Sequence, residues 1–138
     1  MIKHIWSVIC ERIVVDQTTN LVSYQTCLEG ITAAKLPFNL TAFAFGSRWY
    51  KDSSDDEKLS FRLTCVTPKG NENLLVQVDD QILSAPSHRT NILLNGLPFE
   101  EEGTYYFTLK MKRENKLIKI AEIPFSVSVQ SNPKTVNK

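Results

Sequence analysis

Two histidines, His4 and His88, are the candidates for a general base in this chain. Nucleophilic catalysis needs such a base beside its nucleophile. Ser87 precedes His88, but neighbours in an extended chain point to opposite sides, so these two cannot form a catalytic pair. Cys65 is compatible with His88 in spacing, although a cysteine within an apolar strand pattern is typical of a buried thiol. No Gly-x-Ser-x-Gly elbow occurs. We therefore expect a protein without catalytic residues or enzymatic activity.

Carboxylates gather in two polar stretches and form a candidate calcium site. The first stretch spans residues 51–58, and the second, 79–88, begins with two aspartates. Sandwich domains of the C2 type hold Ca²⁺ with carboxylates from loops at one end, and loops separated by two strands can share an end. No EF-hand-like spacing is present, and acidic loops are commonly only solvated, so we expect no metal and no cofactor. The residues of this calcium alternative are Asp52, Asp55, Asp56, Asp79 and Asp80, with Glu57 beside the first three.

Aromatic side chains offer a second ligand class, because sugars stack on exposed rings. The candidates are Trp6, Tyr24, Trp49, Tyr50 and Tyr106. Tyr50 and Tyr106 occupy outward positions of their predicted strands and could form a platform. Such residues also make cross-strand pairs on a half-covered sheet face, and the sequence does not choose between the two.

The cysteines are odd in number and lack the spacing of metal ligands. They are Cys10, Cys27 and Cys65. Pairing Val15 with Leu21 across the polar turn at 16–20 places Cys10 opposite Thr26. Cys27 is then one position out of register and points to the other face, so we expect no Cys10–Cys27 disulfide and three buried thiols instead.

The totals indicate one globular domain of 138 residues with a formal net charge of +1. Near-zero charge gives no long-range field toward nucleic acid or an anionic membrane, so neither is an expected partner. The N-terminal apolar run ends at Glu11-Arg12 without a cleavage site, so we expect a cytoplasmic protein. A basic group at 110–116 is typical of a solvated hairpin tip, with phosphate binding as the alternative. Its members are Lys110, Lys112, Arg113 and Lys116.

The residues that could carry out chemistry must be positioned by strands, and the stretch 102–112 is the central predicted strand. One side of an extended chain here carries Tyr105, Phe107, Leu109 and Met111, and the other side is polar. Such alternation predicts a strand with one buried face. Gly103 suits a tight corner before the strand, and Tyr105 can anchor the core while its hydroxyl reaches a backbone group.

About eight such strands, separated by turn signals, predict an all-β fold: a two-sheet antiparallel sandwich with Greek-key connections. Residues 29–40 are expected to cross between the sheets, and 79–88 to form a connection. The alternation changes phase in the last strand, which predicts a bulge near 121–124 and an edge position at Pro124. We expect one domain over residues 1–129 and a flexible C-terminal tail over 130–138.

Two long stretches, 7–31 and 97–127, resemble a bacterial family of small single-domain proteins classed as a domain of unknown function. The similarity covers the opening hairpin, the crossing that ends near Pro37, and the C-terminal half with its Leu97-Pro98-Phe99 and Ile123-Pro124-Phe125 segments. It implies an immunoglobulin-like or C2-like sandwich and transfers no catalytic residue. The Gly103-Thr104-Tyr105 corner also resembles the tyrosine corner of immunoglobulin-type domains.

The leading functional hypothesis is a non-enzymatic protein-interaction module that binds a protein partner through an exposed sheet edge or associates with itself. The expected interaction face carries Tyr106, Thr108 and Tyr50, and it should be less charged than the rest of the surface. The alternative is a ligand-binding module for calcium or carbohydrate. An enzyme would require a pocket that gathers His4 or His88 with a carboxylate.

Overall fold

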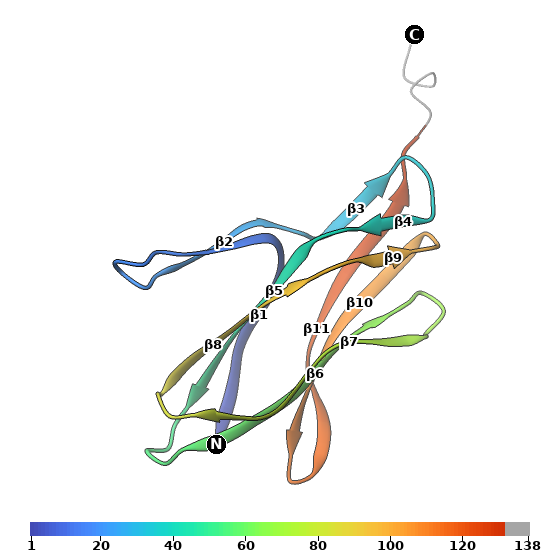
Figure 1. The fold of residues 1–138 in the computed structure, drawn as a ribbon. Helices are drawn as coiled ribbons and strands as arrows, with labels where there is room; N and C mark the ends of the chain where they lie inside the picture. Colours follow the sequence, from blue (N-terminus) through green and yellow to red (C-terminus); the bar gives the residue numbers. More distant parts are fainter. Residues whose placement is uncertain (132–138) are drawn as a thin grey trace.

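A computed structural model describes residues 1–131 of the chain, and it is all-β, with eleven strands in three sheets (Figure 1). The four-stranded sheet has the order β2-β1-β5-β8. Its strands are β1 (Ile2–Val15), β2 (Val22–Cys27), β5 (Phe43–Lys51) and β8 (Ser87–Leu94). Within this described part there is no helix of the length and apolarity that a membrane span requires.

The second sheet has five strands in the order β3-β11-β10-β6-β7, and β4 pairs with β9 in a third, two-stranded sheet. The five strands are β3 (Gly30–Ala33), β11 (Lys116–Val129), β10 (Gly103–Arg113), β6 (Glu57–Val66) and β7 (Glu72–Leu83). The third sheet consists of β4 (Phe38–Leu40) and β9 (Leu97–Phe99).

The all-β prediction is confirmed, but the strand inventory differs from the predicted eight strands in two antiparallel sheets. Residues 29–40 carry the chain from the first sheet to the second and back, and they contain β3 and β4. β3 runs parallel to β11, so the larger sheet is mixed. The expected connection at 79–88 is shorter than predicted: β7 continues to Leu83 and β8 begins at Ser87, so only residues 84–86 connect them.

The core forms between the two larger sheets, and the alternation along β10 builds one wall of it. Tyr105, Phe107, Leu109 and Met111 are all buried, as predicted. Across the core, Phe107 meets Phe43 of β5 with ring centroids 6.1 Å apart. Large aromatic side chains therefore bridge the two layers and supply much of the buried apolar area.

The predicted corner before β10 is confirmed. The Tyr105 hydroxyl donates to the Glu101 carbonyl at 2.8 Å. Gly103 has φ of +137°, and a Cβ there would lie 2.8 Å from Cγ of Pro68. A side chain at position 103 would therefore meet both backbone strain and a steric clash.

The phase change in β11 is caused by a register shift opposite the Leu109–Lys110 step of β10, where Ile120 is the extra residue. It lies just before the predicted window of 121–124. At Pro124 the strand pairs with Tyr106 of β10 on one side, while β3 joins on the other side only from Ser126 onward. The predicted edge position of Pro124 is thus confirmed. The predicted tail at 130–138 lies, after its first two residues, outside the described residues.

The register of the first hairpin differs from the prediction by one residue. Val15 pairs with Val22, and this places Cys10 opposite Cys27. The Asp16 amide donates to the Leu21 carbonyl at 2.8 Å, so Asp16 still belongs to the ladder and the loop is shorter than expected. Figure 1 shows the end of the β1–β2 hairpin projecting beyond the other strands of its sheet.

Candidate functional site

His4 lies in a chain of hydroxyl groups on the inner face of the four-stranded sheet. His4 Nε2 and Ser7 Oγ share a hydrogen bond of 2.6 Å, and Ser7 Oγ lies 3.0 Å from Ser47 Oγ. The imidazole edge packs on Trp49, with ring centroids 5.2 Å apart. Burial lowers the pKa of His4, so the neutral ring is favoured. The cluster has the serine and the base of a catalytic dyad, but its hydrogen bonds in the described residues include no carboxylate to orient the ring.

His88 pairs with Trp49 across the β5–β8 ladder and does not join this cluster. Burial lowers its pKa as well. Neither histidine lines any of five surface hollows with volumes of 190–640 Å³. The hydrogen bonds of the cluster pair the polar atoms of part-buried side chains, as buried polar groups require.

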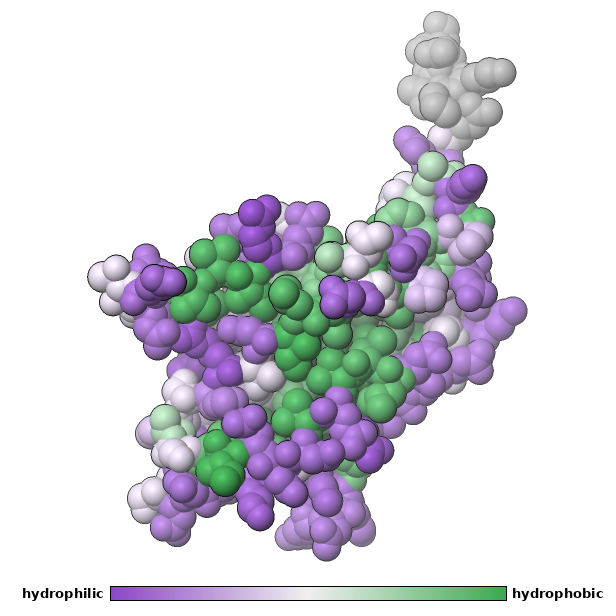
Figure 2. Space-filling model, viewed as in Figure 1, coloured by the Kyte–Doolittle hydropathy of each residue, from purple (hydrophilic) through white to green (hydrophobic). Residues whose placement is uncertain are grey.

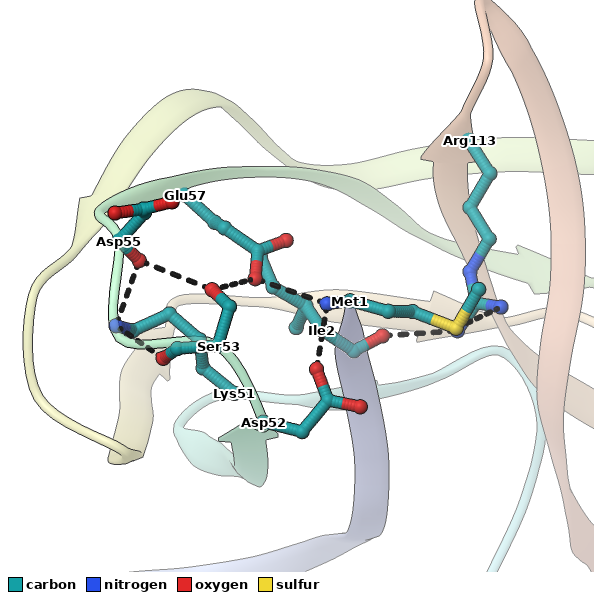
Figure 3. Close-up of polar contacts among 8 residues, drawn as sticks. All are labelled: Met1, Ile2, Lys51, Asp52, Ser53, Asp55, Glu57 and Arg113. Atoms are coloured by element: carbon teal, nitrogen blue, oxygen red, sulfur yellow. Dashed lines mark hydrogen bonds and ion pairs between the residues drawn. The ribbon is translucent and has the colours of Figure 1, made fainter.

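The first acidic stretch forms the β5–β6 loop, and a lysine occupies its centre (Figure 3). Lys51 is only 2% exposed, and its ammonium donates to the carbonyls of Ser53 at 3.1 Å and Asp55 at 2.8 Å. Asp52 and Glu57 contact the main-chain ammonium of Met1, at 2.6 and 3.0 Å. Two carbonyls of this loop therefore already bind a cation of the protein itself, the Lys51 ammonium.

The second acidic pair does not meet this loop. Asp79 and Asp80 lie within β7, and the Asp80 amide and carboxylate both contact Ser60 of β6. Among residues 1–131, no three side chains of the metal-ligating types gather around one point. The two acidic stretches do share one end of the molecule, as expected, because Leu83 pairs with Glu57 and the Lys51 amide donates to the Pro86 carbonyl. Asp79 and Asp80 themselves lie further along β7, short of the first loop.

The structure does not bring the predicted interaction residues together. Tyr50 lies on β5 in the four-stranded sheet, whereas Tyr106 and Thr108 lie on β10 in the other layer. Thr108 is only 3% exposed. Tyr50 and Tyr106 therefore cannot form one aromatic platform, and Thr108 is not available to a partner.

The outer face of β10 is also more charged than expected. Lys110 forms an ion pair with Glu72 at 3.0 Å, and Lys119 pairs with Glu122 at 3.4 Å. The expected weakly charged face is not found here. The remaining members of the basic group lie around the β10–β11 turn, as predicted for a hairpin tip, and Arg113 donates to the Ile2 carbonyl at 2.9 Å.

An open sheet edge remains as the strongest surface feature, and it is formed by β8, the last strand of its sheet. The Lys51 amide donates to the Pro86 carbonyl at 2.8 Å. In an antiparallel ladder this bond makes Tyr50–Ser87 a non-hydrogen-bonded pair and fixes the alternation along β8. The backbone groups that point away from β5, into the open edge, belong to Ser87, Arg89, Asn91 and Leu93.

The β8 edge lacks the features that protect other edges from pairing. Its register with β5 is continuous from Leu94 to Ser87, and Arg89 is its one formally charged residue. The β7 edge, by contrast, has two register shifts and carries three acidic side chains. β3 has only four residues, and β2 is interrupted by Thr26 with φ of +56°.

Apolar side chains line the opening between the β8 and β7 edges. Ile92 and Leu94 from β8, and Val76 and Val78 from β7, pack against the core but stay only partly buried. Figure 2 shows apolar surface in the middle of this face, between the two layers. Ile92 and Leu94 stay uncovered because, among residues 1–131, no strand pairs with the far side of β8.

The β1–β2 hairpin packs on the outer face of the same sheet and reaches β8. The Tyr24 hydroxyl donates to Asn91 Oδ1 at 3.1 Å, and Arg89 donates to the Asn20 carbonyl at 2.8 Å. Tyr24 also meets Trp6 edge-on, with ring centroids 5.0 Å apart. Two candidate sugar-binding rings are therefore engaged with each other, and the hairpin holds β8 in place from outside.

Ile92 and Leu94 fall on one side of an extended chain over 89–95, as in a strand, but the sequence gives no reason to single out Asn91 or Leu93. Alternation showed that Leu93, which is 73% exposed, points away from the core. It could not show that β8 is the last strand, because sheet order depends on pairing between distant segments.

The similarity to known proteins extends over nearly the whole chain. A model described as a family of unknown function, DUF6941, matches residues 5–128. No curated protein matches the chain.

Proposed function

The chain belongs to DUF6941, a family of unknown function, and we propose that it is a non-enzymatic protein-interaction module that accepts an extended segment of a protein partner along β8. Addition of a strand to an open edge is a recurrent mode of peptide recognition. Main-chain hydrogen bonds supply affinity in this mode, and pockets for alternate side chains supply specificity.

The observation that carries the proposal is the regular, unprotected edge of β8. The backbone amide and carbonyl of Arg89, Asn91 and Leu93 point away from β5, to the side on which a partner strand could pair. Soluble proteins normally blunt such edges with charge, proline or bulges. An edge of eight residues that has one charged side chain and neither a proline nor a bulge is consistent with one that is covered by a partner.

The surroundings of β8 define the chemistry of that partner. A strand added there would place alternate side chains over the opening toward β7, against Ile92, Leu94, Val76 and Val78. We therefore infer a segment with apolar residues at alternate positions. A second copy of this chain is the other possible occupant, since its own β8 carries such a pattern.

A photo-crosslinking experiment tests the proposal. A photoreactive phenylalanine analogue replaces Leu93 on the β8 edge, and the same analogue replaces Ile82 of β7, which is 56% exposed, as the matched control. We expect adducts from position 93 to one extended peptide, whose sequence by mass spectrometry distinguishes a partner from a second copy. Equal or absent adducts at both positions would contradict β8 as the contact.

A second pair of variants tests strand addition itself. Asn91→Pro removes an amide that points away from β5, so the β5–β8 ladder is kept while strand addition is blocked. Asn91→Ala removes the same side chain and its contact with Tyr24 but keeps the amide. We expect the adduct at position 93 to be lost with proline and kept with alanine.

A ligand-binding module is the other functional class that the sequence allows, and a rise in melting temperature on adding Ca²⁺ would favour it.

The finer fold description, an immunoglobulin-like or C2-like Greek-key sandwich, is supported by the Tyr105 corner. The bacterial origin and cytoplasmic location expected from the sequence stay predictions.

A further inference from the structure

Two cysteines lie opposite each other in the ladder at the base of the β1–β2 hairpin. Cys10 and Cys27 are direct partners in the ladder. The Leu28 amide donates to the Ile9 carbonyl at 2.8 Å, so the pairing of β1 with β2 extends past this pair. The Cα atoms of directly opposed residues in an antiparallel ladder lie about 4.5–5.5 Å apart. A disulfide needs a Cα separation of roughly 4.4–6.8 Å, so the backbone already meets this requirement.

The two thiols differ in their access to solvent. Cys27 is exposed on the edge strand β2, whereas Cys10 is fully buried and its thiol donates to the Arg12 carbonyl at 3.4 Å. An oxidant from solution can therefore react with Cys27, and Cys10 can then react with Cys27, its partner in the ladder. The third cysteine, Cys65, lies in the core on β6 and has neither exposure nor a partner cysteine in its ladder.

We propose that Cys10 and Cys27 are a thiol–disulfide exchange site that reacts with low-molecular-weight disulfides such as oxidised glutathione. The Cys27 thiolate attacks one sulfur of glutathione disulfide, which forms a mixed disulfide and releases one glutathione thiolate. Cys10 then gives up its proton and attacks Cys27 Sγ, which forms the Cys10–Cys27 bond and releases the second glutathione. The protein loses two protons and two electrons, and the small disulfide is reduced to two thiols.

The buried partner sets the pH dependence of the second step. Burial raises the pKa of the Cys10 thiol, and the attacking species is the thiolate. Closure of the mixed disulfide should therefore become faster as the pH is raised from neutral. Because the backbones of Cys10 and Cys27 are already paired, formation of the disulfide needs only a rotation of the two side chains.

Intact-mass measurement with thiol counting tests the site. The reduced full chain is incubated with glutathione disulfide, denatured and alkylated. We expect the number of alkylated cysteines to fall from three to one, with the mass of an internal disulfide and no bound glutathione. Peptide mapping should join Cys10 to Cys27, and Cys65→Ala should behave like the wild type with one fewer alkylation.

Two further variants separate the steps. Cys10→Ala should stop at the mixed disulfide and keep one glutathione on Cys27. Cys27→Ala should take up no glutathione in the folded state. A wild-type protein that stays fully reduced, that keeps a stable glutathione adduct, or that links Cys65 instead would overturn the proposal.

Discussion

Gly46 of β5 is the position at which a single methyl group should report on the packing of the hairpin. A Cβ at Gly46 would collide with the ring of Tyr24, whose nearest atom is Cε1. Gly46 is buried beneath that ring, so Gly46→Ala must displace Tyr24 from the outer face of the sheet. The displacement breaks the two contacts by which Tyr24 ties the hairpin to β1 and β8.

The expected cost follows from those contacts. The edge-on contact of Tyr24 with Trp6, at 5.0 Å, contributes about 0.5–1.5 kcal/mol. The hydrogen bond from Tyr24 to Asn91, at 3.1 Å, contributes about 0.5–1.5 kcal/mol. The substitution also raises the free energy of unfolding by about 0.5–1 kcal/mol, because alanine restricts the unfolded chain more than glycine does. We therefore expect a net loss of about 1 kcal/mol in the free energy of unfolding, with limits of about 0–2.5 kcal/mol.

Urea unfolding followed by tryptophan fluorescence measures this loss. With a slope of about 1–3 kcal/mol per molar urea, the midpoint should fall by about 0.3–1 M. A double-mutant cycle supplies the control: in a Tyr24→Ala background, Gly46→Ala should be neutral or slightly stabilising. An equal loss in both backgrounds would refute the reasoning, because the methyl group would then be colliding with something other than Tyr24.

Two further predictions concern the corner and the histidines. Tyr105→Phe removes the hydrogen bond to the Glu101 carbonyl and should lower the free energy of unfolding by about 1 kcal/mol, whereas Tyr106→Phe, in which no such bond is lost, should leave the urea midpoint unchanged. Burial lowers the pKa of His4 and His88, so the unfolded chain binds protons more readily than the folded one. Their contribution to stability is therefore present above the unfolded pKa of about 6.5 and is lost as the pH falls through the lower folded pKa. Urea midpoints measured from pH 7.5 to pH 5 should fall less steeply in His4→Gln and His88→Gln than in the wild type; an unchanged slope would show that neither ring is responsible.

The alternation of side chains was enough to predict which face of β10 is buried. Phe107 and Leu109 are buried, and Lys110 lies on the outer face, because successive side chains of a strand point to opposite sides wherever the strand lies. The Tyr105 corner was also predictable, since a glycine with positive φ and a tyrosine two residues later act within one turn.

The register of the β1–β2 hairpin depends on which residues are assigned to its turn. The Asp16 carboxylate accepts the amides of Thr18 and Thr19, at 2.8 and 3.0 Å, so Asp16 caps the turn from within the ladder. Counting Asp16 as a loop residue shifted the pairing by one, and a shift of one moves every side chain to the other face. This single error hid the Cys10–Cys27 pair.

By itself, the sequence determined that this chain forms strands, which of their faces are apolar, and where the tight corner before β10 lies, because these properties are set by neighbouring residues. Only the tertiary structure decided that Tyr50 and Tyr106 belong to different layers, that Lys51 occupies the acidic loop, and that β8 ends its sheet. These facts depend on which distant segments pair and pack. Alternation within a strand gives the direction of a side chain but carries no information about the strand's neighbours.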